Sequence, residues 1–301
     1  MDYIIKDLLD IDSAQLSRYY AEFTDKNFHF YEKKFGLFKK LNILMGKVAI
    51  DSNDGTIIAS YLFIDQMLLA NPKLKSAQSI DTLVRPDARG GNILRALAKS
   101  LYSDLKYQGY QCIYGMPSKS LALFLERVLK WNKSKDTFRY IVFIPLPILR
   151  LIGFVANTFL TLNYKLTNCT GGISLKHFDS LSNIFLNSDS KAFFFLKSPY
   201  IASVLKSSTI YVDIGFIRKQ GSAQSWLNRL FHLSFLALHT KGMFYRTYAS
   251  VDSETARYIS CFSFATKSLP FSGKLYLKGE EHVSFGEQSI EFIEYDNFFF
   301  Q

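Results

Sequence analysis

The chain has 301 residues, of which 48% are hydrophobic and 21% are charged. This composition argues against a disordered chain, and the length is enough for about two domains. The net charge of +10 favours anionic partners, but the basic residues are scattered and form no zinc-finger or RNP motif, so we expect no nucleic-acid partner. The three cysteines lack C-x-x-C spacing, and we expect neither disulfides nor a metal site.

The first 64 residues are predicted to form a strand, two helices and a hairpin. The strand covers residues 3–6, and Ser13 caps an amphipathic helix that ends near Phe23. Residues 27–41 are aromatic and basic, and we interpret their apolar stripe as part of the core. Two β-rich runs around Asn53-Asp54-Gly55 predict a hairpin.

The most informative stretch follows, with a strand, a glycine loop and a helix in direct succession. The strand covers residues 79–84 and is stopped by Pro86, and the loop contains Gly90-Gly91. The helix starts at Ile93, and a helix N-terminus offers unpaired N–H groups to an anion such as a pyrophosphate. Arg89 would add a cation at the edge of this seat. The alternative is that the glycines only make a tight turn.

Residues 84–97, VRPDARGGNILRAL, resemble the V-x-P-x-x-R-G-x-G-[IL]-x-x-x-L signature of the GCN5-related N-acetyltransferases. The resemblance implies an α/β fold with the mixed central sheet of that family, and acetyl-CoA or another acyl-CoA as co-substrate. In the family the loop and the helix start hold the pyrophosphate, and the preceding strand binds the pantetheine amide. The cofactor-binding residues that it implies are Leu83, Val84, Arg89, Gly90, Gly91, Asn92, Ile93 and Leu94.

A second motif lies downstream, where Gly115-Met116-Pro117-Ser118 follows a short strand and opens a helix that closes on Trp131. This pattern is similar to the G-[FV]-P-N … F … G-W pattern of a subgroup found among bacterial surface-polysaccharide genes, which implies an amino-sugar acceptor. The chain departs from both motifs, with Asn92 at the second glycine of the signature, Ser118 at the asparagine and Lys130 at the glycine before Trp131. Asn92 tolerates unusual φ values, so the loop can keep its shape.

The resemblance also implies catalytic roles. Asp81, on the strand before the loop, is the candidate base that deprotonates an acceptor amine. Glu126 stands where many family members have a tyrosine that returns a proton to the thiolate. Ser118 is a further candidate for substrate contact, and its alternative role is to cap the helix that follows Pro117.

Residues 137–144 are predicted to be the last strand of a first domain over residues 1–145, of which the resemblance covers residues 3–144. An amphipathic helix from residue 148 to 163 would follow, with an apolar stripe through Ile148, Leu151 and Val155 and with Arg150 opposite. This helix either docks on the second half of the protein or contacts a membrane surface. Together with a polar stretch that ends at residue 172, it would form a linker over residues 146–172.

Residues 173–301 repeat the order strand, loop, helix, glycine, strand, helix. We interpret them as a second, degenerate domain of the acetyltransferase type. Its loop, residues 218–222, lacks the R-G-x-G pattern, so we expect no cofactor there. His232 and His239 lie on a largely apolar predicted helix and are interpreted as buried structural histidines.

Taken with the resemblance, these features predict an N-acyltransferase that moves an acetyl or other acyl group from acyl-CoA to a small-molecule primary amine. Two alternatives stay open: transfer of a long acyl chain from CoA or an acyl carrier protein, and a non-catalytic binding or scaffold protein. The N-terminal residues lack a secretory signal, which predicts a cytoplasmic protein, with peripheral contact to the inner membrane face if the helix at 148–163 binds lipid. The sequence does not indicate an oligomeric state.

Overall fold

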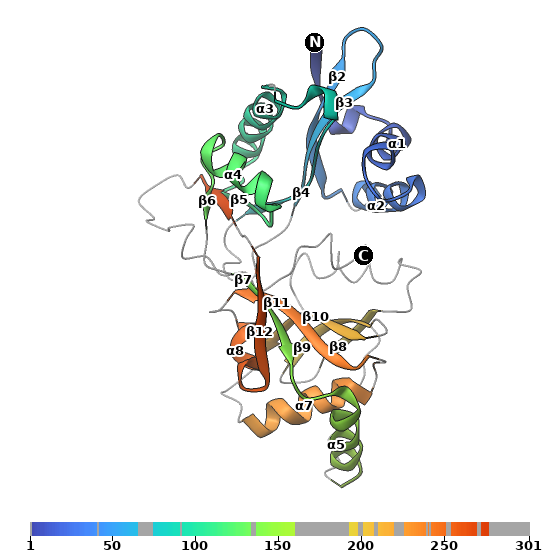
Figure 1. Cartoon of the computed structure of the whole chain (residues 1–301), viewed down its shortest axis with the longest axis vertical. Helices are drawn as coiled ribbons and strands as arrows, with labels where there is room; N and C mark the ends of the chain where they lie inside the picture. Colours follow the sequence, from blue (N-terminus) through green and yellow to red (C-terminus); the bar gives the residue numbers. More distant parts are fainter. Residues whose placement is uncertain are drawn as a thin grey trace. The chain divides into compact units, whose positions relative to one another are not determined.

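The structure is a computed structural model, and it describes most of the chain. The described residues are 2–40, 42–65, 75–90, 92–133, 137–159, 193–197, 201–207, 210–219, 226–238, 240, 242–250, 254–269 and 272–276. They form two compact units, each with its own sheet (Figure 1). The first unit contains the described residues up to 133 together with 272–276, and the second contains residues 137–269.

The first unit is built on a seven-stranded mixed sheet, which we call sheet A, with the strand order β1-β2-β3-β4-β5-β13-β6. Only the β4–β5 pair is parallel, and the other neighbours are antiparallel. A mixed α/β sheet of this kind is the fold class that the sequence predicts. The strands are β1 (Tyr3–Asp7), β2 (Leu44–Asp51), β3 (Ile57–Asp65), β4 (Ser76–Val84), β5 (Cys112–Gly115), β6 (Asn132–Lys133) and β13 (Ser272–Leu275).

Helices cover both faces of sheet A (Figure 1). Because side chains alternate along a strand, Ser60 of β3 faces α1, where it bonds Tyr20, and the next residue, Tyr61, faces α3, where it bonds Tyr102. The α3 face carries a core cluster that includes residues of α4, so the two helices share this face. The helices are α1 (Ser13–Phe23), α2 (Phe28–Lys40), α3 (Ile93–Tyr107) and α4 (Lys119–Arg127).

Local sequence explains how the N-terminal elements begin and end. Gly55 has φ +72° in the turn between β2 and β3, as the hairpin motif predicts. The cap of α1 differs by one residue from the prediction, because Asp12 rather than Ser13 accepts the N–H of Ala14. In α2 the aromatic stripe is buried, which confirms that it belongs to the core: Phe35 and Phe38 are 0% exposed.

The second unit is built on a six-stranded sheet, which we call sheet B, with the order β12-β7-β11-β10-β9-β8. Its order along the chain, β10-α7-β11-α8, repeats β4-α3-β5-α4 of the first unit, as the sequence predicts. The strands are β7 (Thr137–Val142), β8 (Phe193–Lys197), β9 (Ile201–Ser207), β10 (Tyr211–Lys219), β11 (Phe244–Ser250) and β12 (Ser263–Leu269). The helices are α5 (Leu146–Phe159), α7 (Trp226–Leu238) and α8 (Glu254–Ile259).

Two strands are exchanged between the units. The prediction that residues 137–144 close the first sheet is wrong, because β7 lies in sheet B between β11 and β12. The equivalent place in sheet A, between β5 and β6, is taken by β13 from near the C-terminus. The boundaries between the two units therefore differ from the expected boundaries at residues 145 and 172. Strands that are close in sequence pair more often. The entropic cost of closing a longer loop grows only slowly with loop length, so a strand that is distant in sequence can take the same place.

Helix α5 packs against α7 within the second unit, so the predicted docking is confirmed. The docking face differs from the predicted stripe, because Leu149 is fully buried whereas Ile148 and Leu151 are 52% and 65% exposed. Arg150, expected to face solvent, donates to the carbonyl oxygens of Ala237, Thr240 and Gly242 at 3.0, 2.7 and 2.9 Å. A guanidinium that satisfies carbonyls at a helix end holds α5 more specifically than apolar contact alone.

No described helix combines the length and apolar character needed to cross a bilayer. Contact of residues 148–163 with a membrane surface stays a prediction, and the exposed side chains of Ile148, Leu151 and Val155 would make it. Two other predictions lie outside the described residues: the polar end of the linker and His239. The side chain of His232 is also outside them.

Two glycine substitutions should change the free energy of unfolding in opposite directions. A Cβ on Gly153 of α5 would lie 2.6 Å from the Ser234 carbonyl oxygen of α7, so Gly153→Ala should destabilise the second unit by about 1–3 kcal/mol. Gly36 of α2 has nothing within 4 Å of such a Cβ, so Gly36→Ala should stabilise its helix by about 0.5–1 kcal/mol. Urea unfolding of both variants measures the difference, and equal effects would contradict the packing described for α5.

Candidate active site

The candidate site begins where β4 and β5 separate. These strands pair in parallel only from Ser76 to Gln78 of β4, which lie opposite residues 112–114 of β5. Residues 79–84 of β4 continue along β3 alone, and all six are partly exposed. Their backbone groups on the β5 side therefore have no strand partner in the described part of the chain. A gap of this kind lets an extended ligand hydrogen-bond to a strand edge and connects the two faces of the sheet.

A β-bulge in β4 sets the direction of the candidate base Asp81. Opposite β4, Phe63 pairs with Ser79 and Tyr61 pairs with Thr82, so two residues of β4 face one residue of β3. The extra residue interrupts the alternation, and Asp81 points to the α1–α2 face. There its Oδ2 lies 2.8 Å from Nζ of Lys34 on α2.

The partner lysine was not singled out from the sequence. Its side chain is only 2% exposed, and its ammonium lies 5.8 Å from the ring centroids of Tyr31 and Phe35. A buried ammonium needs a counter-charge, so the pair fixes both α2 and the Asp81 carboxylate. The pair uses one carboxylate oxygen of Asp81, Oδ2. Lys34 falls on the apolar stripe of Tyr31, Phe35 and Phe38, and a lone cation on such a stripe could have indicated a buried partner.

The predicted phosphate seat lies at the other end of β4. Gly90 has φ +85°, a conformation that side chains rarely adopt, and nothing lies within 4 Å of a Cβ placed there. Asn92 is the N-cap of α3 with φ −84°, so no unusual conformation has to be tolerated, and its side chain makes no cap hydrogen bond. The first turn of α3 also lacks acidic residues, so the helix start has a positive partial charge that no carboxylate within that turn offsets. Gly91 lies outside the described residues.

Two side chains donate hydrogen bonds to backbone carbonyl oxygens at the end of β4. Nε of Arg89 donates to the Val84 oxygen at 3.1 Å, and the Tyr19 hydroxyl donates to the Leu83 oxygen at 3.0 Å. The guanidinium of Arg89 therefore lies against the strand end, next to the start of α3. Ile93 is buried and Leu94 is half-buried, so these two residues contribute their backbone N–H groups to the helix start.

The two candidates on α4 differ in what surrounds them. Ser118 caps α4, since its Oγ accepts the N–H of Leu121 at 3.4 Å, which confirms the alternative interpretation. Glu126 is half-buried near the end of α4. Among the described residues no contact joins either side chain to Asp81, and no group of three or more metal-ligating side chains is found.

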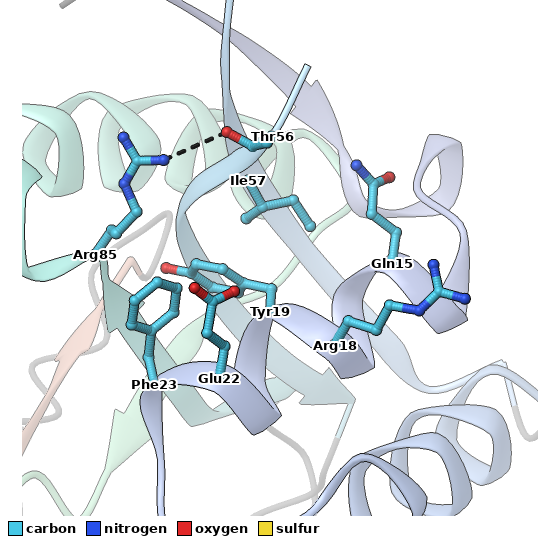
Figure 2. A pocket seen from close by; sticks show the side chains of 8 residues that line it. All are labelled: Gln15, Arg18, Tyr19, Glu22, Phe23, Thr56, Ile57 and Arg85. Atoms are coloured by element: carbon cyan, nitrogen blue, oxygen red, sulfur yellow. Dashed lines mark hydrogen bonds between the residues drawn. The ribbon is translucent and has the colours of Figure 1, made fainter. Parts of the chain in front are cut away.

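A pocket of about 220 Å³ opens between α1 and the end of β4 (Figure 2). Asp81 also points to the α1–α2 face of the sheet. Tyr19, Phe23 and Ile57 give it an apolar lining, and Arg18 and Glu22 of α1 and Arg85 bring charges. The Arg85 guanidinium is fixed by a hydrogen bond to Thr56 Oγ1 at 3.3 Å and by Asp87. Burial raises the pKa of the Tyr19 hydroxyl, so this group is a neutral hydrogen-bonding group in the floor. No sequence motif indicates this pocket, because its lining comes from three separate segments.

No protein-family model matches the sequence, and the comparison with curated proteins also found no match. Solved structures do resemble the chain. A GCN5-related N-acetyltransferase from Kribbella flavida is 13% identical, with a TM-score of 0.60 over 91% of this chain and 71% of its own. A probable N-acyltransferase from Enterococcus faecalis V583 is 11% identical, with a TM-score of 0.59 over 91% and 73%. A fungal glucosamine N-acetyltransferase region is 13% identical, with a TM-score of 0.56 over 91% and 38%.

The likeness thus extends over most of the chain, while the identities are too low to transfer an activity. The mixed α/β sheet agrees with the fold that the glycine motif implies. The chain therefore has the fold of the GCN5-related N-acetyltransferases.

Proposed function

We propose that this protein is an N-acyltransferase that moves an acetyl or other acyl group from acyl-CoA to the primary amine of a small molecule. The observation that carries the proposal is the separation of β4 from β5 beyond Gln78, on the strand that leads to the start of α3. The pyrophosphate would bind the N–H groups from Gly90 to Leu94, with Arg89 beside it. The pantetheine arm would then follow the free edge of β4 into the gap.

Donor and acceptor would reach the gap from opposite faces of sheet A. The acyl-CoA lies on the α3–α4 face, and the amine approaches from the α1–α2 face, where Asp81 and the pocket lie. Asp81 takes one proton from the ammonium, because only the neutral amine has a lone pair that can attack the thioester. The C–N bond forms and the C–S bond breaks. The second amine proton passes to solvent, and Glu126 or solvent returns a proton to the thiolate sulfur.

An amino sugar is the acceptor class that we propose, destined for a surface polysaccharide by analogy with the subgroup motif. One similar structure is a glucosamine N-acetyltransferase region, which supports this class. The pocket lining of two arginines, one glutamate and two aromatic rings would suit a sugar that also carries an anionic group, as a phosphorylated or nucleotide-linked amino sugar does. The second unit would be a degenerate acetyltransferase-like domain that binds no acyl-CoA.

Isothermal titration with acetyl-CoA tests the proposal, followed by transfer assays with glucosamine 6-phosphate and nucleotide-linked amino sugars. We expect a dissociation constant in the micromolar range, which corresponds to about 8 kcal/mol. The same titration with palmitoyl-CoA tests the long-chain alternative. If no acyl thioester gives heat or a thermal shift, the fold has lost its co-substrate, and a scaffold role becomes the better explanation.

A further inference from the structure

The pocket between α1 and the end of β4 contains two arginine side chains that differ in their partners. Arg85 donates from Nε to Oδ1 of Asp87 at 2.7 Å and from Nη1 to Oγ1 of Thr56 at 3.3 Å. The hydrogen bond with Asp87 and the charges of Asp51 and Asp54 raise the pKa of the Arg85 guanidinium above its ordinary value. The positive charge of Arg85 is therefore already offset by carboxylates of the protein.

Arg18 of α1 is the second arginine in the lining, and its side chain is exposed. Within the described ranges of the chain, its guanidinium makes no ion pair or hydrogen bond. Glu22 lies one turn further along α1, at a spacing that commonly gives an ion pair. Figure 2 shows why none forms here: the Arg18 side chain extends toward Gln15, whereas the Glu22 carboxylate lies beside the ring of Tyr19. Arg18 thus brings a positive charge to the pocket that none of the described carboxylates offsets by direct contact.

Aromatic rings and a carboxylate lie between the two guanidinium groups in Figure 2. The Tyr19 ring is fixed by a hydrogen bond from its hydroxyl to the Leu83 oxygen at 3.0 Å, and the Phe23 ring packs edge-on against it, with 5.6 Å between centroids. These rings suit the apolar face of a sugar, and the Glu22 carboxylate can accept hydrogen bonds from sugar hydroxyls. Because a carboxylate repels an anion, the anionic end of a ligand is expected at Arg18.

The volume of the pocket limits the size of this ligand. It is about 220 Å³, whereas pockets that enclose a drug-sized molecule have about 300–1,000 Å³. A single sugar ring with one small anionic group suits this space better than a sugar joined to a nucleotide. Leu83 is two residues beyond Asp81 on β4, roughly 7 Å of extended strand, so the ring of Tyr19 is anchored a short distance along the strand from the proposed base.

We propose that Arg18 is a specificity-determining residue that binds the phosphate of a phosphorylated amino-sugar acceptor. A guanidinium can donate two parallel hydrogen bonds to a phosphate, and it binds an uncharged hydroxyl in the same place much more weakly. The sugar ring would pack on Tyr19 and Phe23. This assignment rests on the proposed function, and it favours a sugar phosphate over a nucleotide-linked sugar as the acceptor.

Acetyl transfer to glucosamine 6-phosphate and to glucosamine tests the assignment. Arg18→Gln should raise KM for glucosamine 6-phosphate about tenfold and leave KM for glucosamine unchanged, because only the phosphate loses its partner. The value of kcat should change by less than about twofold, since Arg18 does not contact the reacting atoms. Arg18→Lys keeps the charge but loses the two-pronged geometry, so its KM should lie between those of the wild type and Arg18→Gln.

Arg257→Gln serves as the control, because it removes the same charge from an exposed arginine of α8 in the second unit. It should leave KM for both acceptors unchanged. If Arg18→Gln raises KM for both acceptors equally, the side chain does not recognise the phosphate. If Arg18→Gln weakens acetyl-CoA binding, the pocket belongs to the co-substrate. Either result would overturn the assignment.

Isothermal titration with glucosamine 6-phosphate, in the presence and absence of CoA, separates this assignment from the proposed function. If wild-type protein binds the sugar phosphate about tenfold more tightly than Arg18→Gln does but never transfers an acetyl group, the assignment holds and the proposed function fails. If the variant transfers acetyl to glucosamine 6-phosphate as efficiently as the wild type, the proposed function holds and the assignment fails. Absence of binding to wild-type protein would also contradict the assignment.

Discussion

Gly90→Glu is expected to weaken acetyl-CoA binding by at least about a hundredfold, close to 3 kcal/mol. The substitution puts a negative charge into the proposed pyrophosphate seat, where the helix start and Arg89 favour anions. It also forces a side chain onto a backbone with φ +85°. Isothermal titration of the variant measures the loss directly.

Gly109→Glu is the matched control for this substitution. Gly109 lies just after the other end of α3, has φ +82° and has nothing within 4 Å of a Cβ placed on it, so the backbone strain is nearly the same. Both variants should lose a similar amount of unfolding free energy, while only Gly90→Glu should lose affinity. Equal affinities in the two variants would mean that the loop is an ordinary turn and that acyl-CoA, if it binds, binds elsewhere.

Asp81→Asn is expected to lower the rate of acyl transfer by at least about a hundredfold while acetyl-CoA affinity stays unchanged. The amide cannot take the proton of the acceptor ammonium. It also removes the carboxylate charge 2.8 Å from the Lys34 ammonium, which is only 2% exposed, and this should cost about 3 kcal/mol of unfolding free energy. Steady-state kinetics and urea unfolding give the two numbers separately.

The double variant Lys34→Met/Asp81→Asn separates catalysis from stability. Replacing the ammonium by an apolar side chain of similar length removes the buried positive charge, so most of the lost unfolding free energy should return. The transfer rate should stay as low as in Asp81→Asn, because the base is still missing. Recovery of activity together with stability would show that Asp81 acts only as a structural partner of Lys34.

Local patterns in the sequence were enough to predict the elements around the site. The alternation and proline stop of residues 79–84, the turn at Gly55 and the helix from Ile93 all involve neighbours within a few residues, where backbone geometry and capping decide the outcome. The family motif added the fold class because it joins a strand, a loop and a helix in one short signature. The order of elements in the second unit followed from the same reasoning.

Features that depend on distant partners could not be predicted in this way. The bulge at residues 80–81 exists only relative to β3, and it decides that Asp81 faces α2. Lys34 lies on a buried apolar stripe of α2, and it pairs with a carboxylate almost fifty residues further along the chain. For α5, the sequence identifies an apolar stripe. A different face packs against α7, because that face allows the close approach at Gly153 and brings Arg150 within reach of backbone carbonyl groups.

The exchange of β7 and β13 has a consequence for synthesis on the ribosome. Strand β5 is complete at residue 115, but its neighbour β13 begins at residue 272, about 160 residues later. At translation rates of about 5–20 residues per second, the edge of β5 would stay open for roughly 8–30 s. An unpaired strand edge is prone to pair with other chains during that time. Newly made chains should therefore depend on chaperones that shield this edge until residues 272–275 emerge.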